Sequence, residues 1–398
     1  MKKIKIILGA FVLCLFISGC WNYRELNELA ITTGISIDIK ENKYIISYMI
    51  ANSKKSQDSS GKSEANTVVL SGEGKSISEA YMNLNSKNPK IPYISHLEVI
   101  IISEDAAKEG ITKMLDFLMR NPESRKEFLV VLSKGTTASS ILETLSPLEA
   151  FPSQNVAKNI ISNKDDQSII MLEDYSDFVS NVLREGINPV LSGVEIEGES
   201  DEAKKQESLE SSTPSANIKI NTLGIFKDDK LIGWANEKET IGINIINNEA
   251  GSVLLNARCD NEYMASTLTN IATESKISLE GKNPKIRLNV KATGALVEIN
   301  CKRNLEETGT IDELKANFEN ELKYLIQNSI ELAQKKYKSD IFGFGNKIYK
   351  QDFKKWKQIK NNWDNEIFPN IKFEVEVDIA LSSKGSFEQT ILEVKNEE

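Results

Sequence analysis

The sequence LEVIIIS at positions 97–103 is a short apolar run that contains a single charged residue. Runs of this kind are typical of strands buried on both faces of a sheet. A second run, FLVVL, follows at 128–132, and the residues at 104–120 between the two runs have the apolar periodicity of a helix. Strand, helix and strand in this order predict an α/β fold.

The same pattern continues on both sides of these runs. Alternating residues at 35–39, a turn at 40–43 and an apolar segment at 44–50 predict a β-hairpin. Ser76 and Glu79 have the spacing of a capping box and predict the start of a helix. Further strands are expected at 67–70 and 190–196, and further helices at 138–145 and 169–184. Residues 20–196 therefore read as an N-terminal α/β domain with a mixed sheet.

A change of composition follows at 197–216. These residues are charged, rich in serine and almost free of large apolar side chains. Such a stretch cannot bury enough surface to offset the cost of ordering it. We expect it to be an acidic linker or a long exposed loop.

Residues 217–398 predict a second, α+β region, with an alternative division into 217–262 and 263–398. A capping box at Thr310–Glu313 is expected to open the longest helix, which continues to about Lys338. The closing segment alternates apolar and charged residues, as does a strand with one buried and one solvent-exposed face. We expect an antiparallel sheet covered by the long helix, built from a hairpin at 218–234, strands at 253–259, 286–299 and 373–381, and a last hairpin partner at 387–394.

The N-terminus has the features of an export signal. A basic start, MKKIK, precedes an apolar run at 6–17, which is shorter than the roughly 20 residues needed to cross a bilayer. The run ends in ISGC at 17–20, which resembles the lipobox of bacterial lipoproteins. We expect residues 1–19 to be a signal peptide and Cys20 to carry S-diacylglyceryl and N-acyl groups. An uncleaved short anchor or an ordinary secretory peptide is the alternative.

Composition excludes several kinds of function. The chain has 58 acidic and 49 basic residues, and this net charge of −9 argues against a nucleic-acid-binding protein. His96 is the sole histidine, which excludes zinc sites with two or three histidines. Once Cys14 leaves with the signal and Cys20 is acylated, Cys259 and Cys301 remain. We expect two free buried cysteines there, and a disulfide is permitted as the alternative.

The motifs that resemble catalytic or binding sites are better explained by structure. GEGKS at 72–76 lacks the first glycine of a P-loop, because that position is Val69. FGFG at 342–345 reads as a sharp turn that returns two phenylalanines to the core. Trp356 and Trp363 are interleaved with lysines. This region is either a contact to a bilayer or to an acidic protein face, or a solvated helix face whose tryptophans are buried. We therefore predict no catalytic residue, metal site or cofactor.

Four blocks of sequence span nearly the whole chain after Cys20: CWNYRELNELA at 20–30; HLEVIII at 96–102 with GI at 110–111, LDFLMR at 115–120 and PESR at 122–125; GIF at 224–226 with KLIGW at 230–234; and DIFGFG at 340–345 with Trp356, Trp363 and the closing alternating strand. Together, and in this order, the blocks resemble the Ger(x)C family of spore germination lipoproteins, the C subunits of nutrient germinant receptors. One departure is Asn22, where aspartate is usual in the family.

The resemblance implies a non-enzymatic subunit on the outer face of the cell or spore inner membrane. Its partners would be an A-type and a B-type integral-membrane subunit, together with the bilayer through Cys20, and no nucleic acid. The assembled receptor would sense nutrients and trigger the release of dipicolinic acid. A solute-binding lipoprotein of a transporter is the alternative function, since it would share the anchor and a two-lobed α/β architecture.

Overall fold

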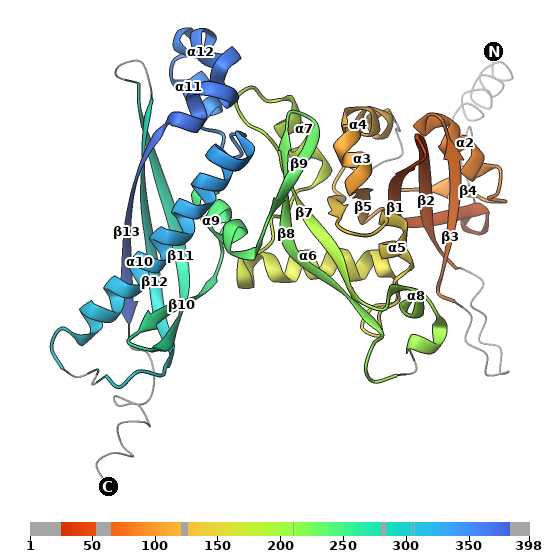
Figure 1. Ribbon diagram of the computed structural model, residues 1–398. Helices are drawn as coiled ribbons and strands as arrows, with labels where there is room; N and C mark the ends of the chain where they lie inside the picture. The colour runs from red at the N-terminus through yellow and green to blue at the C-terminus, as the bar shows by residue number, and fades with distance from the viewer. Residues whose placement is uncertain are drawn as a thin grey trace, which may run out of the picture.

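The computed structural model describes residues 25–52, 65–120, 126–209, 211–279, 284–303, 305 and 307–382. The chain forms two lobes, each built on one β-sheet, which stand side by side in Figure 1. We call the part from residue 25 to 235 the N-terminal lobe and the part from 237 to 382 the C-terminal lobe. The predicted combination of α/β and α+β architecture is confirmed.

The N-terminal lobe contains a nine-stranded mixed sheet in the order β3-β2-β1-β5-β6-β7-β8-β9, with β4 paired to β1. The central strands β1, β5, β6 and β7 run parallel, as does the short β4 beside β1, whereas β2, β3, β8 and β9 are antiparallel to their neighbours. Its strands are β1 (Leu29–Lys40), β2 (Lys43–Ala51), β3 (Thr67–Gly74), β4 (Ile91–Tyr93), β5 (Val99–Ser103), β6 (Leu129–Ser133), β7 (Val190–Gly198), β8 (Ala216–Lys227) and β9 (Lys230–Ala235).

Helices cover both faces of this sheet, which explains why β5 reads as a continuous apolar run. Ile100 and Ile102 pack with α2 (Ile77–Asn85), α3 (Glu104–Glu109), α4 (Thr112–Met119) and α7 (Tyr175–Leu183). Val99 and Ile101 face the opposite side, against α5 (Ala138–Glu143) and α6 (Pro152–Gln167).

Three local expectations in this lobe are corrected. The helix predicted at 104–120 is two helices, because Gly110 has a φ of +115° and breaks it. The helix predicted at 169–184 starts at Tyr175, after an extended segment. The preceding helix α6 was not predicted, because most of its residues are polar and only a narrow stripe around Val156 and Ile160 is buried.

The acidic stretch at 197–216 connects β7 to β8. These two strands are antiparallel neighbours, paired from Val190–Ile225 at one end to Gly198–Ala216 at the other. It is therefore a loop within one sheet, as one of the two expectations had it, and not a link between two sheets. It contains the short helix α8 (Ser200–Ala203), and Ala203 is buried. β8 begins next to residue 217, where the second region was predicted to begin, but β8 and β9 belong to the first sheet.

The C-terminal lobe has a four-stranded sheet in the order β10-β11-β12-β13. The expected all-antiparallel sheet is wrong, because β13 pairs in parallel with β12 from Lys285–Lys372 onward. Residues 387–394, the expected hairpin partner, lie outside the described residues. The alternative division at 262 would cut the β10–β11 hairpin, in which Cys259 pairs with Glu262. The strands are β10 (Val253–Cys259), β11 (Glu262–Ser278), β12 (Lys285–Ile299) and β13 (Lys372–Ser382).

The long helix covers one face of this sheet, as predicted (Figure 1). α10 (Thr310–Glu331) continues as a π-helical segment, Leu332–Tyr337. The N-cap residue of α10 is Gly309, and no side chain there accepts a hydrogen bond from the first turn. The capping box predicted at Thr310–Glu313 is therefore wrong. α9 (Glu237–Asn247), α11 (Phe344–Gln351) and α12 (Phe353–Ile359) complete the lobe, and one hydrophobic core joins its residues to Leu223 and Ile225 of β8.

Candidate functional site at the joint between the lobes

Two of the sequence blocks described above meet at the joint between the lobes. The DIFGFG turn and the tryptophans that follow it lie against the segment that connects α7 to β7 and against the β8–β9 turn. A cleft of about 790 Å³ opens between them. It is lined from both lobes, including Lys113, Glu185, Asp228, Trp356 and Asp364. We describe this joint as the candidate functional site.

Asp340 organises the C-terminal side of the joint. Its carboxylate is fully buried and accepts hydrogen bonds from the backbone N–H of Phe342 (3.2 Å), Phe344 (3.3 Å) and Gly345 (2.7 Å). The indole Nε1 of Trp363 donates a fourth at 2.9 Å. Burial raises the pKa of Asp340 to about 7, while the Gly345 N–H acts in the opposite direction. The carboxylate therefore fixes the turn that opens α11.

Asp364 and Asn188 carry this network across to the N-terminal lobe. Asp364 accepts from the backbone N–H of Asp340 at 3.0 Å and from the side-chain amide of Asn188 at 3.2 Å. Asn188 in turn donates its backbone N–H to the Asp340 carbonyl and accepts from the backbone N–H of Asp228, at 2.8 and 2.9 Å. Burial raises the pKa of Asp364. One asparagine thus ties three segments together.

Close backbone contact between the lobes requires a glycine at position 186. Gly186 has a φ of +78°, and a Cβ there would lie 2.4 Å from the carbonyl carbon of Gly345. Its carbonyl accepts from the backbone N–H of Asn346 at 2.8 Å. Next to it, the carboxylate of Glu185 accepts from Trp356 Nε1 at 2.8 Å. The indole of Trp356 thus donates to Glu185 on the N-terminal lobe, whereas that of Trp363 donates to Asp340 on the C-terminal lobe.

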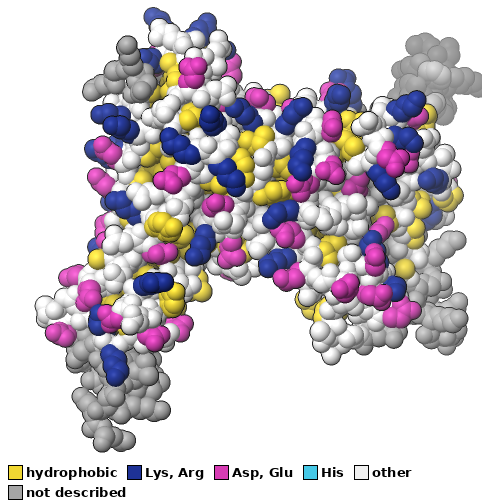
Figure 2. Space-filling model, viewed as in Figure 1, with side chains coloured by type: hydrophobic (Ala, Val, Ile, Leu, Met, Phe, Trp, Pro, Cys, Tyr) yellow, Lys and Arg dark blue, Asp and Glu magenta, His cyan; other side chains and the backbone are white. Residues whose placement is uncertain are grey.

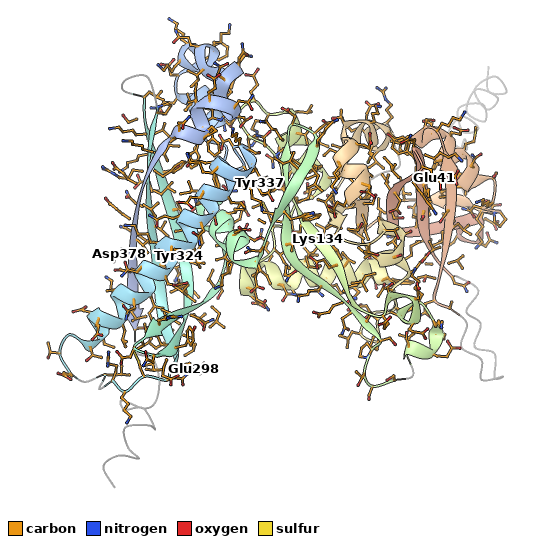
Figure 3. All side chains as sticks on the ribbon, in the orientation of Figure 1. Glu41, Lys134, Glu298, Tyr324, Tyr337 and Asp378 are labelled. Carbon is orange, nitrogen blue, oxygen red and sulfur yellow. A yellow bond between two sulfur atoms is a disulfide. The ribbon has the colours of Figure 1, made fainter. Side chains whose placement is uncertain are left out.

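Tyr337 is the last residue of the π-helical segment that continues α10, and it makes a second contact between the lobes. Its hydroxyl accepts from the backbone N–H of Trp234 at 3.0 Å and donates to the carbonyl of the same residue at 2.9 Å. Figure 3 shows Tyr337 between the end of the helix and β9. Gly233 lies under its ring, where a Cβ would come within 2.3 Å. The side chain therefore satisfies backbone groups at the edge of the sheet.

These contacts fix the position of one lobe on the other, and they contain no arrangement of a nucleophile with a base. The buried carboxylates accept hydrogen bonds, as buried charges must if their desolvation is to be offset. Within the described ranges, no group of three or more His, Cys, Asp or Glu residues could hold a metal ion.

The structure places the other predicted features as follows. Cys20, the predicted lipidation site, lies outside the described residues. His96 is exposed, with its ring 5.7 Å from that of Tyr93. Gly72 and Gly74 pack against the backbone of α2, where a Cβ would meet Ala80 at 2.2 and 2.4 Å. GEGKS is the end of β3 followed by the turn into α2, with Ser76 as the N-cap.

Cys259 and Cys301 form a disulfide, with a Cα–Cα distance of 5.8 Å. The expectation of two free cysteines is therefore wrong. Spacing along the chain gave no indication of the pair, because β10 and the end of β12 are brought together only by β11 lying between them. Trp356 and Trp363 are buried, as one of the two expectations had it.

Sequence reasoning missed Asn188, Glu185 and Gly186. Their short stretch, REGIN at 184–188, signals a turn before the apolar strand β7 and nothing more specific. Their partners on the C-terminal lobe lie more than 150 positions away, at Asn346, Trp356 and Asp364. Among the described residues, no helix is both long and apolar enough to cross a membrane.

Two family descriptions match successive parts of the chain. "Spore germination protein N-terminal domain" matches residues 22–196, and "Spore germination B3/GerAC like, C-terminal" matches residues 221–385. Together they cover most of the chain and identify it as a spore germination protein. The chain belongs to the Ger(x)C family.

Relatives of known name match over nearly their whole length. The chain is 25% identical to spore germination protein KC of Bacillus subtilis (strain 168) over 92% of both chains. It is 22% identical to spore germination protein B3 of the same organism, over 94% of this chain and 96% of that one. The crystal structure of the GerBC protein shares the fold, with a TM-score of 0.56 and 18% identity over 87% of this chain and 96% of that chain.

Proposed function

We propose that the chain is the C-type subunit of a nutrient germinant receptor. In this proposal it is anchored by acylated Cys20 to the outer face of the spore inner membrane and acts by assembly with A-type and B-type integral-membrane subunits. The observation that carries the proposal is the match to spore germination proteins along both lobes. The polar groups at the joint are engaged with one another, which is what a rigid connection between the lobes requires.

The anchor would hold the folded chain close to the bilayer. Glu25 is the first described residue and follows Cys20 by five positions. Since an extended chain spans at most about 3.6 Å per residue, Glu25 lies within about 18 Å of the acylated cysteine. The start of the N-terminal lobe would therefore lie close to the membrane surface, within reach of the loops of an integral-membrane partner.

Cys20→Ala tests this proposal at the anchor. We expect the variant to incorporate no labelled fatty acid and to leave the membrane fraction after an alkaline wash, because its apolar run is too short to span the bilayer. It should also no longer copurify with two polytopic partners from detergent-solubilised membranes.

Cys14→Ala is the matched control. It removes a thiol from the apolar run at 6–17 and leaves the lipobox cysteine in place. This variant should be acylated and retained like the wild type. Full membrane retention and complex assembly of Cys20→Ala would contradict the proposed anchor.

A further inference from the structure

Helices α11 and α12 carry a concentration of positive charge on an acidic protein. Residues 347–360 contain six lysines, no arginine and one acidic residue, whereas the whole chain has a net charge of −9. Lys350, Lys354, Lys355 and Lys357 make no ion pair with any described carboxylate. This region, which we call the lysine patch, therefore keeps most of its positive charge unneutralised.

Aromatic rings are exposed among these lysines. Tyr349 and Phe353 are 38% and 49% exposed, and their rings meet edge to face at 5.4 Å between centroids. Lys357 lies with its Nζ 4.8 Å from the centre of the Phe353 ring. On the inner side, Trp356 and Ile359 are buried and hold α12 against the joint. The two helices thus present rings and ammonium groups outward from a rigid base.

The lysine patch lies at an extremity of the molecule. Figure 1 shows α11 and α12 rising above the neighbouring elements, and Figure 2 shows Lys and Arg side chains in dark blue over this end. A protruding end can touch a flat surface without interference from the rest of the chain.

The chemistry of the patch fits a bilayer better than a protein partner. Protein interfaces favour arginine and are depleted in lysine. Lysine clusters attract anionic headgroups, and aromatic rings are favoured at the boundary between headgroups and acyl chains. Lysine stems and rings together can lie along that boundary while the ammonium groups stay hydrated.

We propose that the lysine patch docks on the anionic headgroup surface of the bilayer, with Tyr349 and Phe353 at the headgroup boundary. This inference rests on the membrane tethering proposed above. The tether supplies proximity, and the patch sets which end of the protein faces the lipid. The joint then couples that contact to the N-terminal lobe, because α12 is held to Glu185 through Trp356.

Vesicle cosedimentation of unacylated protein tests the patch independently of the anchor. The protein would be the chain from residue 20 with Cys20→Ser, which retains the whole described structure, and the probe would be vesicles of phosphatidylglycerol and phosphatidylcholine in equal amounts. We expect binding to these vesicles at low salt, weakened by added salt. Changing Lys350, Lys354, Lys355 and Lys357 to Gln should lower the partition coefficient by about two to three orders of magnitude, since each lysine near an anionic surface contributes about fivefold and the four contributions multiply.

A control variant changes the net charge by the same amount elsewhere. The four lysines chosen are exposed and far from α12 in sequence: Lys40, Lys75, Lys238 and Lys302. Their replacement by Gln should leave vesicle binding within about twofold of the wild type.

Phe353→Ala tests the aromatic contact. It should weaken the part of the vesicle binding that remains at high salt and leave the salt-sensitive part unchanged.

Three results would overturn the proposal: no binding of the wild type to anionic vesicles, equal losses in the two lysine variants, or binding to polyglutamate but not to vesicles. The last would assign the patch to an acidic protein. None of these outcomes bears on acylation of Cys20, which the fatty-acid labelling measures separately.

Discussion

Asp340→Asn is expected to lower the free energy of unfolding by about 1 to 3 kcal/mol, although the amide has nearly the same shape as the carboxylate. Oδ2 of Asp340 accepts from Gly345 N–H and from Trp363 Nε1, and Oδ1 accepts from Phe342 and Phe344. An amide has one acceptor oxygen, so its NH₂ group would face two buried donors in either orientation. Urea unfolding followed by tryptophan fluorescence measures the loss, since Trp363 is itself a partner.

Asp201→Asn is the control for this change. Its side chain is 94% exposed and forms a distant pair with Lys204 at 3.8 Å, so unfolding should shift by less than about 0.5 kcal/mol. An Asp340→Asn protein as stable as the control would show that the buried carboxylate does not organise the joint.

Removal of the disulfide by Cys259→Ala with Cys301→Ala should cost about 4 kcal/mol. The bond closes a loop with a sequence separation of 42, and in the chain-entropy description its loss restores that freedom to the unfolded state. Both side chains are buried in the core of the C-terminal lobe, so alanine also leaves two small voids. Thermal or urea unfolding of the double variant measures the effect.

The wild type in reducing agent supplies the comparison. It should be slightly more stable than the double variant, because reduction removes the same crosslink but keeps the two side chains that fill the core. Mass spectrometry of alkylated, non-reduced protein should find the two cysteines in one linked peptide. Two separately alkylated cysteines in the exported protein would contradict the disulfide.

Burial on both faces made the N-terminal sheet predictable. Val99–Ser103 and Leu129–Ser133 are entirely buried, and their sequences show it as uninterrupted apolar runs. α6 could not be found in the same way, since its exposed faces dominate its composition. α9 was missed for the opposite reason: Thr240–Ile246 are all buried between the lobes, so no amphipathic period exists to be read.

The direction of β13 in the second sheet could not be predicted from the sequence. β13 alternates apolar and charged residues, and this pattern places one face on α10 whether the strand runs parallel or antiparallel to β12. The parallel arrangement follows from the chain between α10 and β13, which returns through α11 and α12 to the end where β12 begins. Side-chain alternation contains no information on that path.

The joint was predictable only in part. The DIFGFG block was correctly expected to be a turn that buries two phenylalanines, and Phe342 and Phe344 are in the core. The role of Asp340 depends on Trp363, and that of Asn188 on Asp364, which is 176 positions away. Such pairings arise from tertiary packing, and one sequence shows them only as separate polar residues.

Deletion of the gene tests the central claim most directly, in a background from which the other genes of this family have been removed. The account predicts that spores then fail to release dipicolinic acid in response to the nutrients that this receptor senses, and that the wild-type gene restores the response. Vegetative growth should be unchanged. If deletion and restoration of the gene leave the response to every nutrient in a broad panel the same, the chain is not a germinant-receptor subunit.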